Sequence, residues 1–158
     1  LLPRLQWNVD ADVEYMMMDF MSFYYGEEAA PYIKEILDIQ AGQIKATAHA
    51  FDFDWHYQSG YYTIGQIAKL DNLWKKAVSA DVTDEQRFRI EKDQLSWEFF
   101  KANQFLGEYF FLNPMRLQAQ EELYDNLLSH GITKVSSFST LPTNKEDVNF
   151  MQRPINWE

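Results

Sequence analysis

The same helix-start signal occurs twice in this sequence, and it constrains the fold more than any other local pattern. Thr63 is followed three residues later by Gln66, and Thr83 is followed by Gln86. In such a capping box, the hydroxyl and the glutamine side chain each bond a free backbone N–H of the first turn. Apolar residues recur at helical spacing after both boxes. The sequence therefore predicts one helix after each threonine, separated by a turn at residues 81–82.

Two earlier helices are predicted from their ends. Asp10 is expected to cap the first helix, and Gly26 to end it in the left-handed conformation. The second is expected to begin in the acidic turn at residues 27–28, to tolerate Pro31 in its first turn and to fade near Ala48. The side chains expected to be buried are Val13, Met16, Met17, Phe20 and Tyr24 in the first helix, and Ile33, Ile36, Leu37, Gln40 and Ile44 in the second.

In the second half of the chain, the helix after Thr83 is followed by one more predicted helix. The helix after Thr83 is expected to run to Glu108, about 40 Å at ~1.5 Å per residue, with Gly107 as its one soft point. Asn113 and Pro114 are a typical cap and first position of a fifth helix, which Gly131 ends. The apolar stripes are Ile67, Leu70, Trp74 and Ala77; Phe88, Leu95, Phe99, Ala102, Leu106 and Tyr109; and Leu117, Leu123, Leu127 and Leu128.

These patterns predict an all-α fold, a bundle of about five helices over residues 9–131. Residues 132–158 are rich in Ser, Thr, Pro and Asn, which favours an irregular C-terminal tail packed on the bundle. Phe138, Phe150 and Trp157 are expected to hold that tail in place. Residues 1–8 open with apolar side chains and no initiator Met, so they are assigned to the end of a preceding domain.

The charge of the chain disfavours several classes of partner. Fourteen basic residues against 24 acidic ones give a formal net charge of −10. Such a charge repels nucleic acid backbones and anionic membrane surfaces. The chain contains no cysteine, so it has neither disulfides nor a thiolate zinc site. No cofactor is predicted.

The segment HAFDFDWHYQSGYY, residues 49–62, is the strongest candidate for a functional site because aromatic rings alternate with polar side chains along it. One interpretation, which we favour, is a loop between helices whose rings pack on the end of the bundle. The alternative is a carbohydrate-facing loop, in which rings stack on sugar C–H surfaces while carboxylates and imidazole bond hydroxyls. The substrate-binding residues of that alternative are Asp52, Asp54, Trp55, His56 and Tyr57.

Other chemistry has little support in the sequence. His49, Asp52, Asp54 and His56 are residue types that bind metals, but aspartates between large rings on a loop are usually solvated, so no metal site is predicted. A di-iron bundle needs Glu-x-x-His pairs, and none of the three histidines has a glutamate three residues before it. There is no Gly-x-Ser-x-Gly elbow or phosphate-binding loop, so no catalytic residue is predicted either.

The stretch LQWNVDADVEYMMMDFMSFYYGEEAAPYIKEILD resembles the helical C-terminal region of bacterial glycosidase-like proteins. The family is one of unknown function related to alpha-glucuronidases and other large barrel glycosidases. Its Trp-Asn-Pro-Asp, Tyr-Tyr-Gly and Ala-Ala-Pro-Tyr motifs correspond to residues 7–10, 24–26 and 29–32, with Val9 in place of the proline. The match covers about the first forty residues.

That resemblance implies a (β/α)₈ barrel ahead of Leu1, with the catalytic acids on the barrel. It also implies a periplasmic or extracellular location. The expected function is that of a non-catalytic accessory domain of a glycoside hydrolase, which buttresses the barrel and lends the aromatic loop to the substrate cleft. The expected partners are the barrel, a carbohydrate ligand and a second copy of the chain. The alternative from another class is a self-contained helical protein-interaction module.

Overall fold

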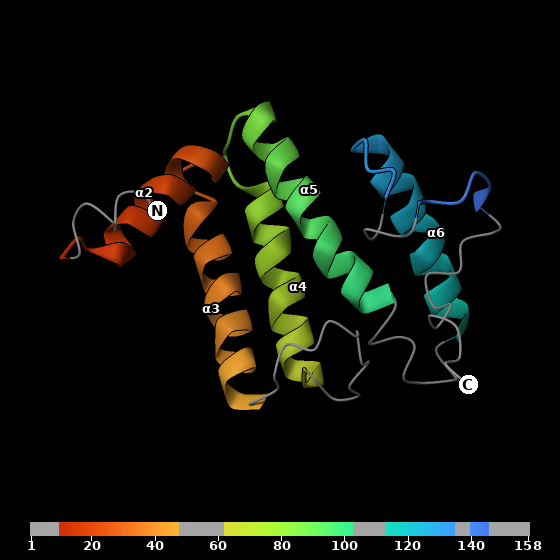
Figure 1. Ribbon diagram of the computed structural model, residues 1–158, viewed down its shortest axis with the longest axis horizontal. Coiled ribbons are helices and arrows are strands. Elements are labelled where there is room, and N and C mark those ends of the chain that lie inside the picture. The colour runs from red at the N-terminus through yellow and green to blue at the C-terminus, as the bar shows by residue number, and fades with distance from the viewer. Residues whose placement is uncertain (1–9, 48–61, 103–112, 135–139, 146–158) are drawn as a thin grey trace. The chain divides into compact units, whose positions relative to one another are not determined.

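Figure 1 shows the computed structural model, which describes residues 10–47, 62–102, 113–134 and 140–145. In these ranges the chain forms five helices: α2 (Val13–Tyr25), α3 (Ala30–Thr47), α4 (Ile64–Ser79), α5 (Asp84–Phe100) and α6 (Asn113–Ser129). In the described part of the tail, Lys134 and Thr140 form an isolated antiparallel bridge. The predicted all-α fold with about five helices is confirmed, and the tail is irregular, as predicted, at residues 132–134 and 140–145.

The chain divides into two compact units, and α5 contributes to both. The described residues of the first unit are 10–47 and 62–91, and those of the second are 92–102, 113–134 and 140–145. The predicted domain boundaries after residues 8 and 131 stay predictions.

In the first unit, α3 packs against both α2 and α4 (Figure 1). Ile36 and Leu70 are fully buried between these helices, where each fully buried side chain of this size contributes about 1.5–3 kcal/mol. Polar bonds support the pairing of α3 with α4, because Lys69 forms an ion pair with Glu35 at 2.7 Å. The other buried apolar residues of the unit are Met21, Ala29, Ala30, Ile33, Tyr62, Ile67, Leu73, Trp74, Ala77, Ala80 and Ile90.

The second unit is built on the last turns of α5, on α6 and on the tail. Leu95, Ala102, Leu123 and Leu127 form its buried cluster. Ile132 and Leu141, from the tail, pack against this cluster. The Tyr124 hydroxyl lies 2.9 Å from the Pro142 carbonyl oxygen and 3.2 Å from that of Thr143, so α6 also holds the tail through hydrogen bonds.

Most predicted helix ends are confirmed. At α4, the Thr63 N–H donates to Gln66 Oε1 at 2.9 Å and the Gln66 N–H donates to Thr63 Oγ1 at 3.2 Å, so the capping box is complete. Thr83 and Gln86 make the same two bonds at α5, at 3.1 and 3.3 Å. Gly131 has a φ of 70° and ends α6, as expected.

The cap of the first helix was predicted at the wrong residue. Asp12, not Asp10, caps α2, and its carboxylate accepts a hydrogen bond from the Tyr15 N–H at 3.0 Å. Both aspartates precede the same apolar pattern, and an acceptor three residues before the N–H it caps has the right reach. Asp12 satisfies this spacing for a helix that begins at Val13.

Several side chains expected to be buried are exposed in the structure. They are Val13 and Phe20 on α2, Leu37 and Ile44 on α3, Phe88 on α5, and Leu117 and Leu128 on α6. On α2 the buried position is Met21, which the predicted stripe omits. Apolar residues cover a wide arc of these helices, and only the part of the arc that faces a neighbouring helix is buried.

Some predictions fall outside the described residues. They include the extension of the helix after Thr83 to Glu108, because α5 ends at Phe100 and only a π-helical turn at residues 101–102 is described beyond it. Phe138, Phe150 and Trp157 also lie outside the described part. No helix within the described ranges is long and apolar enough to cross a bilayer.

Candidate functional site

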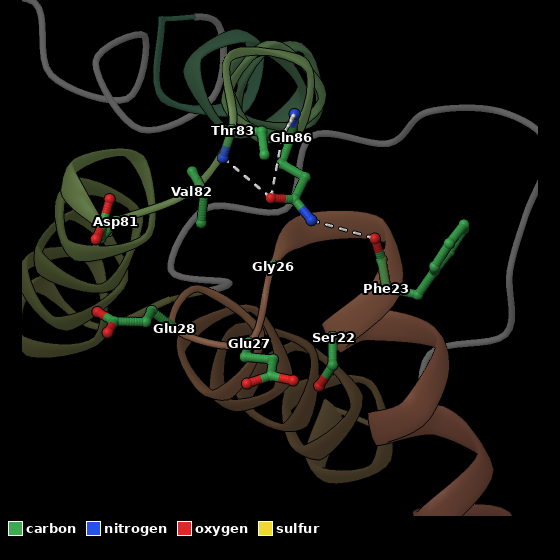
Figure 2. Close-up of a pocket in the computed structure, with 9 residues that line it drawn as sticks. All are labelled: Ser22, Phe23, Gly26, Glu27, Glu28, Asp81, Val82, Thr83 and Gln86. Atoms are coloured by element: carbon green, nitrogen blue, oxygen red, sulfur yellow. Dashed lines mark hydrogen bonds between the residues drawn. The ribbon is translucent and has the colours of Figure 1, made fainter.

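A shallow surface depression lies in the first unit where the α2–α3 turn meets the α4–α5 turn (Figure 2). Residues from the end of α2, from the acidic turn after it, from the α4–α5 connection and from the first turn of α5 line it. The lining residues are Ser22, Phe23, Gly26, Glu27, Glu28, Asp81, Val82, Thr83 and Gln86. Two chain segments more than fifty residues apart in sequence therefore meet at this place.

Gly26 makes this close meeting possible. Its φ of 95° and ψ of 149° are essentially restricted to glycine. A Cβ at this position would lie 2.5 Å from Val82 Cγ1, so a larger residue would also displace the α4–α5 connection. Gly26 ends α2 with a positive φ, as predicted, but its ψ lies outside the left-handed helical region that was expected. The close approach to Val82 has no local signal in the sequence.

Side chains from the start of α5 bond the ends of two other helices. Gln86 Nε2 donates to the Phe23 carbonyl oxygen at 3.3 Å, as Figure 2 shows, and Arg89 donates to that of Tyr24 at 3.1 Å. Arg87 donates to the carbonyl oxygens of Val78 and Ala80 at the end of α4. Terminal carbonyls have no partner within their own helix, so these bonds satisfy groups that would otherwise need water.

The polar groups that line the depression stabilise the fold. The Gln86 amide is occupied by the capping box and by the Phe23 carbonyl. Glu27, Glu28 and Asp81 are exposed to solvent. The Thr83 hydroxyl is likewise engaged in the capping box, where it bonds Gln86. We therefore assign the depression to the junction of α2 and α5.

One face of α2 exposes several large apolar side chains to solvent, which distinguishes it from the depression. Four large apolar side chains are exposed there: Val13 at 44%, Tyr15 at 70%, Phe20 at 51% and Phe23 at 78%. Tyr15, Asp19 and Phe23 are spaced by four residues, which places them in one line along the helix. Val13 and Phe20, seven residues apart, lie on a neighbouring line. We call these five residues the outer face of α2.

Ion pairs hold the other side of α2 against α3. Lys34 Nζ on α3 lies 2.8 Å from Glu14 Oε1 on α2 and 2.8 Å from Asp38 Oδ1 on its own helix. The hydrogen bond to Asp38, and next the one to Glu14, raises the pKa of Lys34 above its ordinary value of 10.5. The outer face therefore belongs to a helix whose orientation on α3 is held by both packing and ion pairs.

The substrate-binding residues of the carbohydrate interpretation, Asp52, Asp54, Trp55, His56 and Tyr57, lie outside the described residues. Their grouping stays a prediction. In the part of the chain that is described, no three His, Asp or Glu side chains come together in a way that could hold a metal ion. Sequence patterns did not single out the outer face, because its residues were assigned to a buried stripe or left unassigned.

Comparison with protein-family models, with curated proteins and with solved structures gave no match.

Proposed function

We propose that this chain is a non-catalytic helical accessory domain that packs against a neighbouring domain through the outer face of α2. The observation that carries the proposal is the exposure of Tyr15 and Phe23 beside Val13 and Phe20 on one helix. Contiguous exposed apolar side chains on a folded protein mark interaction surfaces. Burying this face against a second surface removes apolar area from water, at about 25 cal/mol per Å².

The resemblance of residues 5–38 to glycosidase-like proteins supports a particular neighbour, a (β/α)₈ barrel that carries the catalytic acids. The outer layer of such a barrel consists of helices. A helix face such as that of α2 packs well on helices by fitting its side-chain ridges into grooves. In this proposal the parent protein is a periplasmic or extracellular glycoside hydrolase acting on polysaccharide, and the chain itself hydrolyses nothing.

Hydrogen exchange on α2 tests the proposal. The exchange rates of the α2 amides are measured in the 158-residue chain and in the complete polypeptide that its gene encodes. We expect slower exchange in the complete polypeptide, because docking suppresses local opening of the helix. A double substitution, Tyr15→Ser with Phe23→Ser, should abolish the difference.

The matched control is Ile64→Ser. Ile64 is also 70% exposed and also lies near a helix start, but on α4. This variant should keep the slow exchange in the complete polypeptide. Equal α2 exchange in the two polypeptides would contradict the proposal. A gene that encodes no barrel before Leu1 would favour the alternative of a self-contained protein-interaction module using the same face.

The aromatic loop is a separate part of the proposal and rests on the sequence alone. If Trp55 lends a sugar-stacking ring to the substrate cleft, Trp55→Ala should weaken oligosaccharide turnover by the complete polypeptide and leave its melting temperature nearly unchanged. If the ring belongs to a core instead, the same substitution should cost about 3–5 kcal/mol of unfolding free energy. A large loss of melting temperature with an unchanged Michaelis constant would therefore exclude the cleft role.

A further inference from the structure

The outer face of α2 is apolar except for one carboxylate. Asp19 lies between Tyr15 and Phe23 along the helix, four residues from each. Its side chain is exposed, and no described residue forms a hydrogen bond or ion pair with it. Burying an unpaired carboxylate under an apolar partner would cost several kcal/mol. A partner that covers this face therefore has to supply a group that pairs with Asp19.

Charge and ring placement both favour a cation as that group. The thirteen residues of α2 include two acids and no Lys or Arg. A cationic side chain beside the Asp19 carboxylate also lies within reach of the Tyr15 and Phe23 rings, whose faces attract cations. At the end of the same helix, the Arg89 guanidinium lies 4.6 Å from the centre of the Tyr24 ring and donates to the Tyr24 carbonyl oxygen, so a cation there already contacts both a ring and an oxygen acceptor.

A second copy of the chain fits the face less well. The chain carries a net charge of −10, so two copies repel one another. Opposing α2 helices would also bring Asp19 of each copy to the contact without a cation to pair it, because α2 has no basic residue. Charge complementarity instead selects a partner whose contacting surface is basic.

We propose that the outer face of α2 receives a helix of the partner domain whose apolar side carries one Arg or Lys, and that this cation binds Asp19 between Tyr15 and Phe23. This inference rests on the proposed docking function and adds the chemistry of the partner. At about 1.5 Å per residue, α2 is about 20 Å long, so a partner helix of similar length can cover it. An arginine is favoured over a lysine because its planar group can stack on a ring while it bonds a carboxylate.

Binding of designed helical peptides to the 158-residue chain tests the inference. Three labelled peptides share one amphipathic sequence and differ only at the centre of the apolar side, which carries Arg, Gln or Glu. Fluorescence anisotropy gives their dissociation constants. We expect the Arg peptide to bind at least about fivefold more tightly than the Gln peptide, as for a partly desolvated ion pair of about 1 kcal/mol.

Substitutions in the chain separate the specific contact from general attraction. Asp19→Asn should remove the preference for the Arg peptide, and Asp19→Arg should reverse it in favour of the Glu peptide. Glu28→Gln removes an equal charge from an exposed position outside α2, so it should keep the preference. Phe23→Ala should weaken the binding of all three peptides.

Three results would each overturn the inference. The first is equal binding of the Arg and Gln peptides to the wild-type chain, and the second is an effect of Asp19→Asn no larger than that of Glu28→Gln. The third is a dimer in sedimentation equilibrium that Phe23→Ala dissociates, because the occupant of the face would then be a second copy. Neither experiment depends on α2 exchange in the complete polypeptide. The proposal that the outer face docks on another domain and the inference that Asp19 binds a cation can therefore be refuted independently.

Discussion

At the scale of single residues, the glycines show how backbone shape and close contact each restrict a position. Gly26 combines a φ of 95° with a neighbouring side chain 2.5 Å from the place of a Cβ. Gly131 has a φ of 70° with no atom within 4 Å of that place. Gly42 lies inside α3, without a positive φ and with open space around it. The three positions thus separate backbone strain from steric overlap.

Alanine substitutions at these glycines should have graded effects on stability. We expect Gly26→Ala to lower the free energy of unfolding by at least about 2 kcal/mol, because strain and overlap add. Gly131→Ala should cost about 1–2 kcal/mol, from the left-handed conformation alone. Gly42→Ala should stabilise the chain by about 0.5–1 kcal/mol, because alanine loses less entropy in a helix. Urea unfolding measures all three, and a neutral Gly26→Ala would refute the described junction.

At the scale of helices, local signals in the sequence predicted more than non-local contacts. Thr63 with Gln66 and Thr83 with Gln86 form the expected bonds, because both partners lie in one turn of helix. The bond from Gln86 to the Phe23 carbonyl spans 63 residues, and no sequence spacing encodes it. The ends of helices were therefore largely predictable, while the junction between α2 and α5 was not.

The outer face of α2 illustrates the same limit. Apolar periodicity shows that a helix has an apolar arc, but it does not show which part of a wide arc meets a neighbour. Phe20 was predicted to be buried and is exposed, whereas Met21 is buried. For the candidate site, the sequence identified an aromatic loop, and only the structure identified the exposed face with Asp19.

The contact between α2 and α3 should weaken at alkaline pH. The pKa of Lys34 is raised above 10.5 in the folded state by its bonds to Asp38 and Glu14. A raised lysine pKa contributes stability that is fully present below the unfolded value and is lost as the pH rises through the folded value. The melting temperature of the wild type should thus exceed that of Lys34→Met by a constant amount up to about pH 10.5, and this difference should shrink at higher pH.

The comparison with Lys34→Met cancels the titration of tyrosines and of other lysines, which both proteins share. Circular dichroism melts between about pH 8 and about pH 12 provide the measurement. A difference in melting temperature that does not change up to the highest pH would show that the ammonium of Lys34 contributes nothing to the folded state. Glu14→Gln should give an intermediate difference, because Asp38 still bonds the lysine.

At the scale of the whole molecule, repulsion among acidic residues opposes compactness. The chain has 24 acidic and 14 basic residues. Two of the ion pairs, Lys69 with Glu35 and Lys145 with Asp125, are exposed and individually weak. Net repulsion should therefore outweigh the attraction within these pairs at neutral pH.

Salt should consequently stabilise the protein at pH 7. Raising NaCl from about 0.01 M to about 0.1 M shortens the screening length from about 30 Å to about 10 Å and suppresses long-range repulsion. We expect the first melting transition to rise by about 2–4 °C, which corresponds to about 1 kcal/mol for a chain of this size. Near the sequence pI of about 4.7 the net charge vanishes, so the same salt should give no rise. A lower melting temperature in salt at pH 7 would show that the ion pairs dominate, and an equal rise at both pH values would indicate a general salt effect unrelated to the net charge.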